Sequence, residues 1–64
     1  MEDIKLLTPE EAARLLMVKK DTIYVWARKG KIPCYRLGKC VRFDKNDLIR
    51  FIKRSYHPIR DYGN

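Results

Sequence analysis

Basic side chains that can bind phosphate are concentrated in one stretch of this chain. Residues 19–42 carry eight of them and a single acid, Asp21, so this stretch has the +7 charge of the whole 64-residue protein. The remaining basic and acidic side chains, seven of each, cancel. Cations gathered on an otherwise neutral body are typical of a surface that binds a polyanion. The eight are Lys19, Lys20, Arg28, Lys29, Lys31, Arg36, Lys39 and Arg42.

Residues that could catalyse a reaction or hold a metal ion are few. Cys34, Cys40 and His57 are three potential zinc ligands, one fewer than a closed structural site needs, and no CxxC pair is present. Free thiols in a reducing compartment are the simpler interpretation. The chain also lacks a glycine-rich phosphate loop and the GxSxG and HExxH motifs. We therefore expect no enzymatic activity, no cofactor and no metal site.

Length and composition predict one small folded domain. With 45% hydrophobic residues, three glycines and three prolines, the chain does not have the composition of a disordered basic tail. No apolar run approaches the roughly 18 residues that cross a bilayer. The acidic start, residues 1–3, leads into no apolar signal segment, so we expect a cytoplasmic protein. Residues 1–55 are predicted to form the domain and residues 56–64 a flexible tail.

The first predicted helix has a strong start signal. Thr8 and Glu11 form a T-x-x-E capping box, and Pro9 suits the first helical position. We expect this helix to end near Met17. Its predicted core face follows the i, i+3, i+4 rule and consists of Ala12, Leu15 and Leu16.

Two further helices are predicted. One begins at Lys19 or Lys20, where a lysine stands in place of a good capping residue, and ends at Gly30. The other is capped by Asp44. Their predicted core faces are Ile23, Trp26 and Ala27 in the first, and Leu48, Phe51 and Ile52 with Ile49 at the edge in the second.

A β-hairpin is predicted between these two helices, because apolar and basic residues alternate over 35–37 and again over 41–43. A three-residue loop at 38–40 would place the apolar side chains of both strands on one face and leave Arg36 and Arg42 on the other. A two-residue turn would mix the faces, so we expect the longer loop. The apolar pairs would then be Leu37 with Val41 and Tyr35 with Phe43.

The order helix, turn, helix, hairpin, helix predicts a mainly α fold with a small β-hairpin, a winged helix-turn-helix. Its second helix would enter the major groove of DNA and the hairpin would be the wing. The sequence resembles the small winged-helix domain of the excisionase family, which is related to the DNA-binding head of the MerR regulators. The resemblance covers Leu6 to about Arg54. Its motifs are T-x-x-E-A-A, Thr22-Ile23-Tyr24-x-Trp26, Gly30-x-Ile32-Pro33, R-L-G-x-x-x-R-F and D-L-x-x-F.

The resemblance implies double-stranded DNA binding by a small architectural factor of a bacterial or phage mobile element, such as a prophage. Such a factor assists an integrase or recombinase in site-specific excision, or represses a promoter, and often binds adjacent sites cooperatively and bends the DNA. It implies no membrane and no small-molecule substrate. Two positions depart from the family: Lys19 stands where a capping Ser is usual, and Cys40 where a basic residue is frequent.

Each candidate residue has an expected role at DNA. Arg28 and Tyr24 are the best candidates for base contact, since arginine can hydrogen-bond guanine O6 and N7 together. Asp21 either stabilises the first helical turn or accepts a hydrogen bond from cytosine N4. Val25 either contacts a thymine methyl group or is simply exposed. Phosphate contacts are expected from Lys19, Lys20, Thr22 and Lys31, and wing contacts from Arg36, Lys39 and Arg42.

The aromatic residues of these elements have a structural interpretation. Helical spacing favours Trp26 as a core residue, and strand alternation does the same for Tyr35 and Phe43.

Two alternative functions use related surfaces. A small transcriptional regulator would bind DNA with the same fold, and a protein-interaction module would bind an acidic partner. An RNA-binding role is disfavoured, because aromatic residues exposed on a sheet are not expected.

Overall fold

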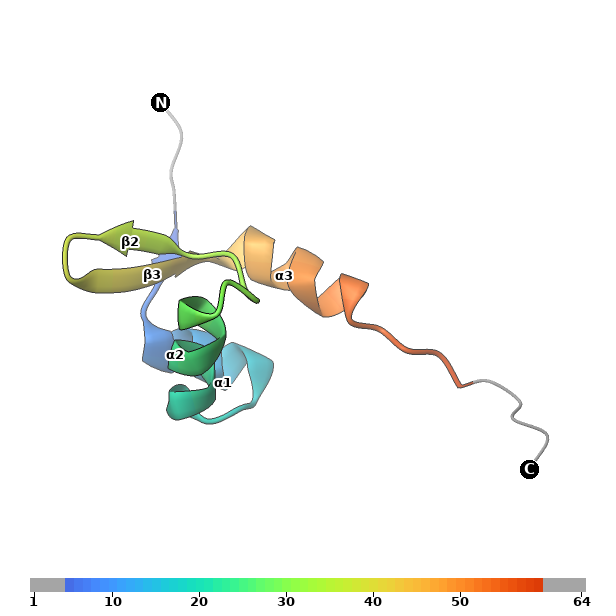
Figure 1. The fold of residues 1–64 in the computed structure, drawn as a ribbon. Helices are drawn as coiled ribbons and strands as arrows, with labels where there is room; N and C mark the ends of the chain where they lie inside the picture. The colour runs from blue at the N-terminus through green and yellow to red at the C-terminus, as the bar shows by residue number, and fades with distance from the viewer. Residues whose placement is uncertain (1–4, 60–64) are drawn as a thin grey trace.

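The computed structural model describes residues 5–59, and predictions on the acidic start and on the end of the tail lie outside this range. The fold consists of three helices and a small antiparallel sheet with the strand order β1-β3-β2, as Figure 1 shows. This is the predicted winged helix-turn-helix, so the fold class is confirmed. In residues 5–59 no helix has the length and apolar character needed to cross a membrane. The elements are β1 (Leu6–Leu7), α1 (Pro9–Leu16), α2 (Lys20–Arg28), β2 (Tyr35–Leu37), β3 (Cys40–Asp44) and α3 (Lys45–Arg54).

Local capping fixes the helix starts as the sequence predicts. The Thr8 hydroxyl accepts a hydrogen bond from the Glu11 amide (3.2 Å), and the Glu11 carboxylate accepts one from the Thr8 amide (2.9 Å). The Asp44 carboxylate accepts from the Asn46 amide (2.7 Å) at the start of α3. Lys19 precedes α2 in an extended conformation and makes no side-chain cap. No Lys19 side-chain cap therefore satisfies the free amides in the first turn of α2.

The core lies where α1, α2 and α3 meet β3. Its fully buried side chains are Ala12, Ile23, Phe43 and Leu48, and Ala13, Ala27 and Ile32 are almost as enclosed. The predicted face of α1 is partly wrong, since Ala13 is buried while Leu15 is 36% exposed. Two small alanines let the backbone of α1 approach its neighbours closely, and this turns the larger leucine outward. Ile52 is also more exposed than predicted, at 42%.

The register of the hairpin differs from the prediction. Arg42 pairs with Tyr35 and Val41 with Arg36, so the turn has two residues, Gly38 and Lys39. Of these two only Gly38 has a positive φ (62°), as a type II′ turn requires. The turn geometry of Gly38 therefore decides the register, rather than the pairing of apolar residues.

This register separates the two arginines of the hairpin. Cross-strand partners share a face, so Arg36 lies with Val41 on the side of the core, and Arg42 lies on the outer face. Tyr35 shares that outer face and is 44% exposed, so its predicted core role is wrong. Phe43 is fully buried, as predicted.

The short strand β1 was not predicted. Leu7 pairs with Phe43 and Leu6 with Asp44, which adds β1 to the free edge of β3. Two residues are too few for strand alternation to be recognised, and Leu7 also suits the position before a helix cap. The strand ties the start of the domain to its central strand.

Candidate nucleic-acid interface

One face of α2 is free to meet a ligand. Ile23 (0% exposed) and Ala27 (3%) turn the opposite face into the core. The four predicted base-contact residues follow helical spacing on the outer side: Asp21, Tyr24 and Arg28 are exposed and Val25 is half-buried. The structure thus brings these four side chains together on one accessible strip.

The residues predicted to contact phosphate lie around the ends of α2 and differ in exposure and in ion pairing. Lys19 and Lys31 are exposed, and Thr22 is half-buried in the first turn. The Lys20 ammonium pairs with the Glu10 carboxylate at 3.2 Å. Hydrogen bonds from its own backbone N–H and from Lys20 lower the pKa of Glu10 from its ordinary value. Lys20 is therefore partly neutralised within the protein.

A loop carries the chain from α2 to the wing. Gly30 takes a positive φ of 71°, and the Lys31 amide donates to the Trp26 carbonyl at 2.8 Å. Ile32, only 3% exposed, then fixes the loop to the core. These contacts set where the hairpin begins relative to the helix.

The three predicted wing cations have different environments. Lys39 is exposed in the turn. Arg42 is half-buried on the outer face, where its guanidinium donates to the Val41 carbonyl at 2.8 Å. The Arg36 guanidinium instead donates to the Ala27 carbonyl at 3.0 Å, near the C-terminal end of α2. The expectation that Arg36 and Arg42 share one face is therefore wrong, and Arg36 connects the wing to α2.

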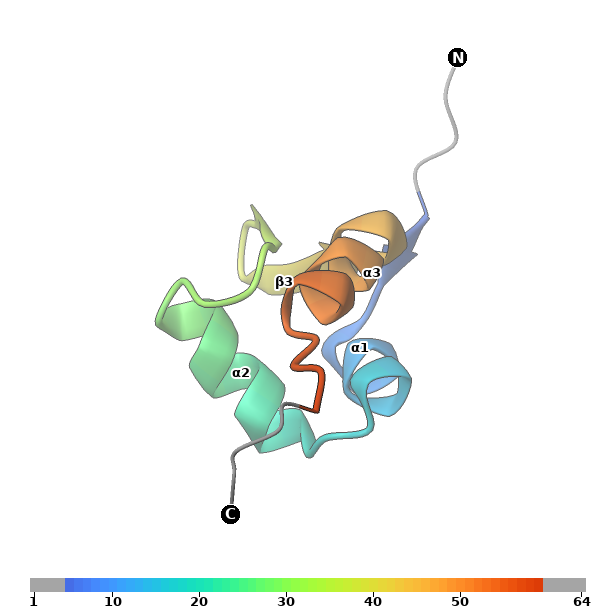
Figure 2. The same cartoon turned by 90° about the vertical axis from the view of Figure 1, so that its right-hand side faces the viewer.

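Helix α2 and the wing lie on the same side of the molecule. In Figure 1 the hairpin and α2 occupy one end, while α3 runs away from both. In the perpendicular view of Figure 2 they again lie together, with α1 on the other side. Among residues 5–59, Lys20 is the one member of the eight-cation cluster that forms an ion pair. Apart from Arg36, whose guanidinium is bonded to the Ala27 carbonyl, the others remain available to an external anion.

The outer wing face also holds apolar side chains that the sequence interpretation did not assign to it. Tyr35 (44% exposed) pairs with Arg42 and Leu37 (50%) with Cys40, next to Lys39 in the turn. Gly38 at the first position of a two-residue turn was the signal that could have identified them. This face therefore offers both cations and apolar surface.

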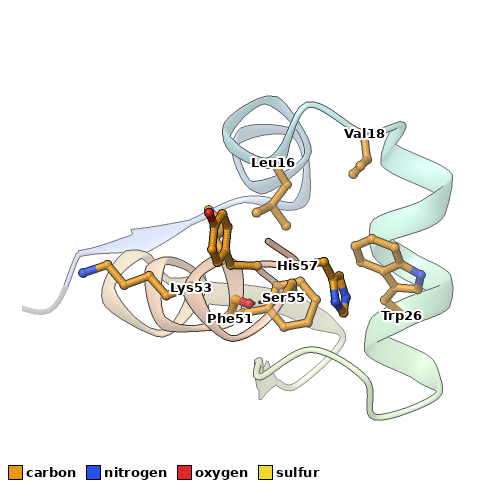
Figure 3. Close-up of a pocket in the computed structure, with 9 residues that line it drawn as sticks. Leu16, Val18, Trp26, Phe51, Lys53, Ser55 and His57 are labelled. Carbon is orange, nitrogen blue, oxygen red and sulfur yellow. Dashed lines mark hydrogen bonds between the residues drawn. The ribbon is translucent and has the colours of Figure 1, made fainter. Parts of the chain in front are cut away.

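The potential metal ligands are dispersed. Cys34 is half-buried and Cys40 is exposed, and both are free thiols. His57 lies beyond α3, beside Trp26 in a pocket whose lining includes neither cysteine (Figure 3). Over residues 5–59, no three side chains of His, Cys, Asp or Glu gather closely enough to hold a metal ion.

Comparison with known proteins agrees with this geometry. Residues 6–56 match the family described as the helix-turn-helix domain, and the chain belongs to this family of DNA-binding domains. One relative is the transcriptional repressor DcmR of Methylorubrum extorquens, 40% identical over 53 residues, which are 80% of this chain and 20% of the repressor. Another is the uncharacterized protein YvgK of Bacillus subtilis, 41% identical over 51 residues, which are 80% of this chain and 17% of that protein.

The chain thus spans about a fifth of the length of the curated relatives that it matches. No solved structure matches it significantly.

Proposed function

We propose that the protein binds double-stranded DNA sequence-specifically, with α2 in the major groove and the wing on the adjacent backbone or minor groove. The observation that carries this proposal is the common placement of α2 and the hairpin on one side of the domain (Figures 1 and 2), together with the exposed residues of the α2 strip. A duplex presents phosphates and base edges within reach of two such neighbouring elements. Its role is non-catalytic, on bacterial or phage DNA in the cytoplasm.

The proposed roles of the residues follow their environments. Arg28 and Tyr24, exposed in the strip, read base edges, and Asp21 and Val25 flank them. Lys19, Lys31, Lys39 and Arg42 contact phosphates, with Thr22 and the partly neutralised Lys20 as weaker contributors. Arg36 acts as a positioning residue, because its guanidinium is bonded to the helix carbonyl of Ala27.

Two biological uses of this DNA binding have separate support. The similarity to a protein named as a transcriptional repressor favours regulation of transcription. The excisionase resemblance favours an accessory role in recombination, with an integrase as partner and cooperative self-association on DNA. A promoter-reporter assay and an excision assay on the selected target site distinguish these two uses.

Duplex titration at several salt concentrations tests the binding itself. With about five phosphate contacts, log K should fall with log salt at a slope of about −4.5, a loss of roughly 500-fold between 50 and 200 mM. Arg28→Ala should relax sequence preference, whereas Lys39→Ala should weaken binding to all sequences alike. No binding at low salt, or equal effects of the two variants on specificity, would contradict the proposal.

A further inference from the structure

An open apolar groove lies away from the proposed DNA surface. It has a volume of about 680 Å³ and runs between the end of α1, the side of α2 and the C-terminal half of α3. Figure 3 shows Phe51 and His57 facing Trp26 across it. Its floor is formed by Leu16, Val18, Trp26, Phe51 and Ile52.

The floor of the groove is well ordered by packing. The Trp26 and Phe51 rings contact each other with centroids 5.9 Å apart and planes inclined by 52°, a favourable tilted geometry. Both rings rest on the core while one side of each faces the opening. Ile52 is 42% exposed there. Large apolar side chains preorganised around a groove are typical of a surface that receives the apolar face of a helix.

The charged residue that lines the groove is a lysine, Lys53. Its side chain is directed away from the floor in Figure 3. Arg54 lies three residues after Phe51, and therefore on the same side of α3. None of the lining residues is acidic. Asp47, one turn before Phe51, is already paired with Arg50.

This charge selects among the possible occupants. A second copy of the chain would bring another +7 charge to a groove lined by Lys53, which disfavours self-association here. Ser55, Tyr56 and His57 of the chain's own tail line the groove, and the volume of about 680 Å³ remains beside them. An acidic partner meets an apolar floor and a complementary charge at Lys53. We propose that the groove binds an amphipathic helix with acidic flanks, supplied by a protein partner.

The groove and the DNA surface can be occupied together. Trp26 is two residues from Tyr24 and from Arg28, and two residues correspond to about 200° around a helix. The groove therefore lies on the opposite side of α2 from the strip proposed to read bases. A partner bound there would be carried to DNA without covering the recognition helix.

The single tryptophan of the chain reports on this site, because Trp26 lines the groove. The probe is a synthetic helix of about four turns, with Leu and Phe at i, i+3, i+4 and i+7 and glutamate on its flanks. The control peptide keeps the apolar residues and carries lysine instead of glutamate. We expect a saturable change in Trp26 fluorescence with the acidic peptide, and binding at least about tenfold weaker with the basic one.

Matched variants locate the binding. Ile52→Gln, in the groove, should weaken the acidic peptide about tenfold, the effect of losing a central apolar contact. Leu15→Gln changes a similarly exposed leucine outside the groove and should leave the affinity unchanged. Equal binding of the two peptides, an unaffected Ile52→Gln variant, or a dimer in sedimentation that this variant abolishes would overturn the proposal.

A duplex titration of the same protein separates this inference from the proposed function. Duplex binding without peptide binding defeats the groove proposal alone. Peptide binding without duplex binding defeats the DNA proposal alone. Displacement of the peptide by duplex would assign the groove to the DNA surface and overturn the inference.

Discussion

Arg36 should contribute to the stability of the domain rather than to its affinity for DNA. Its guanidinium donates to the Ala27 carbonyl at 3.0 Å in a partly buried position. A hydrogen bond to a charged group contributes about 1.5–3 kcal/mol to stability. Arg36 as a whole residue is exposed, and competition from water reduces this contribution to about 1 kcal/mol. In a domain of this size about 1 kcal/mol corresponds to roughly 4–8 °C in Tm. Arg36→Ala should therefore lower Tm by about 5 °C.

Arg42→Ala is the matched control, because it removes the same charged group from the opposite face of the same hairpin. Its hydrogen bond reaches only the carbonyl of the neighbouring residue, Val41, so Tm should hardly change. Loss of one phosphate contact should instead weaken duplex binding about eightfold at 0.1 M salt, since one contact contributes about 0.9 to the slope. Arg36→Ala should leave that slope unchanged.

Circular dichroism melting and duplex fluorescence anisotropy measure both quantities on the same samples. Our assignment of the two arginines fails if both variants lose the same affinity and neither loses stability. It also fails if Arg42→Ala is the variant with the lower Tm. The first result would be expected if the hairpin had the three-residue loop that places both guanidinium groups outward.

Three further predictions concern local structure. Lys19→Ser supplies the missing cap of α2 and should raise Tm by about 4 °C, measured by thermal melting, because a good cap contributes about 1 kcal/mol. The backbone of Met17 is in the left-handed region (φ 59°), and its side chain is 88% exposed. Met17→Gly should therefore relieve backbone strain and raise the free energy of unfolding in urea by about 0.5 kcal/mol, whereas Met17→Ala should not. Because the pKa of Glu10 is lowered in the folded state, its carboxylate stabilises the fold at pH values above the unfolded-state pKa. This contribution to stability is lost as the pH falls through the folded-state pKa. The Glu10→Gln variant should therefore lose less stability than the unsubstituted protein on acidification from about pH 5 to about pH 3.

Features governed by local interactions could be predicted from the sequence. The capping box of Thr8 and Glu11 and the Asp44 cap depend on residues three positions apart or fewer, and both are present. The exposed strip of α2 follows from helical periodicity, because Ile23 and Ala27 determine which side is buried. The location of the positive charge needed no structure at all.

Features governed by tertiary contact could not be predicted from the sequence. Whether Leu15 or Ala13 is buried depends on how closely α1 approaches its neighbours, which periodicity does not contain. The hairpin register was set by the backbone conformation at Gly38, which outweighed the apolar pairing on which the prediction relied. A pattern also identifies an apolar stripe without showing what covers it, so the groove beside Trp26 was not foreseen.

Amide chemical-shift mapping of the full chain with a selected duplex tests most directly whether one DNA molecule meets both elements. Shifts should concentrate in α2 around Asp21, Tyr24 and Arg28 and in the hairpin around Lys39 and Arg42. The groove residues Phe51 and Ile52 should show little change. Shifts confined to α3, or to one of the two elements without the other, would contradict a shared DNA surface.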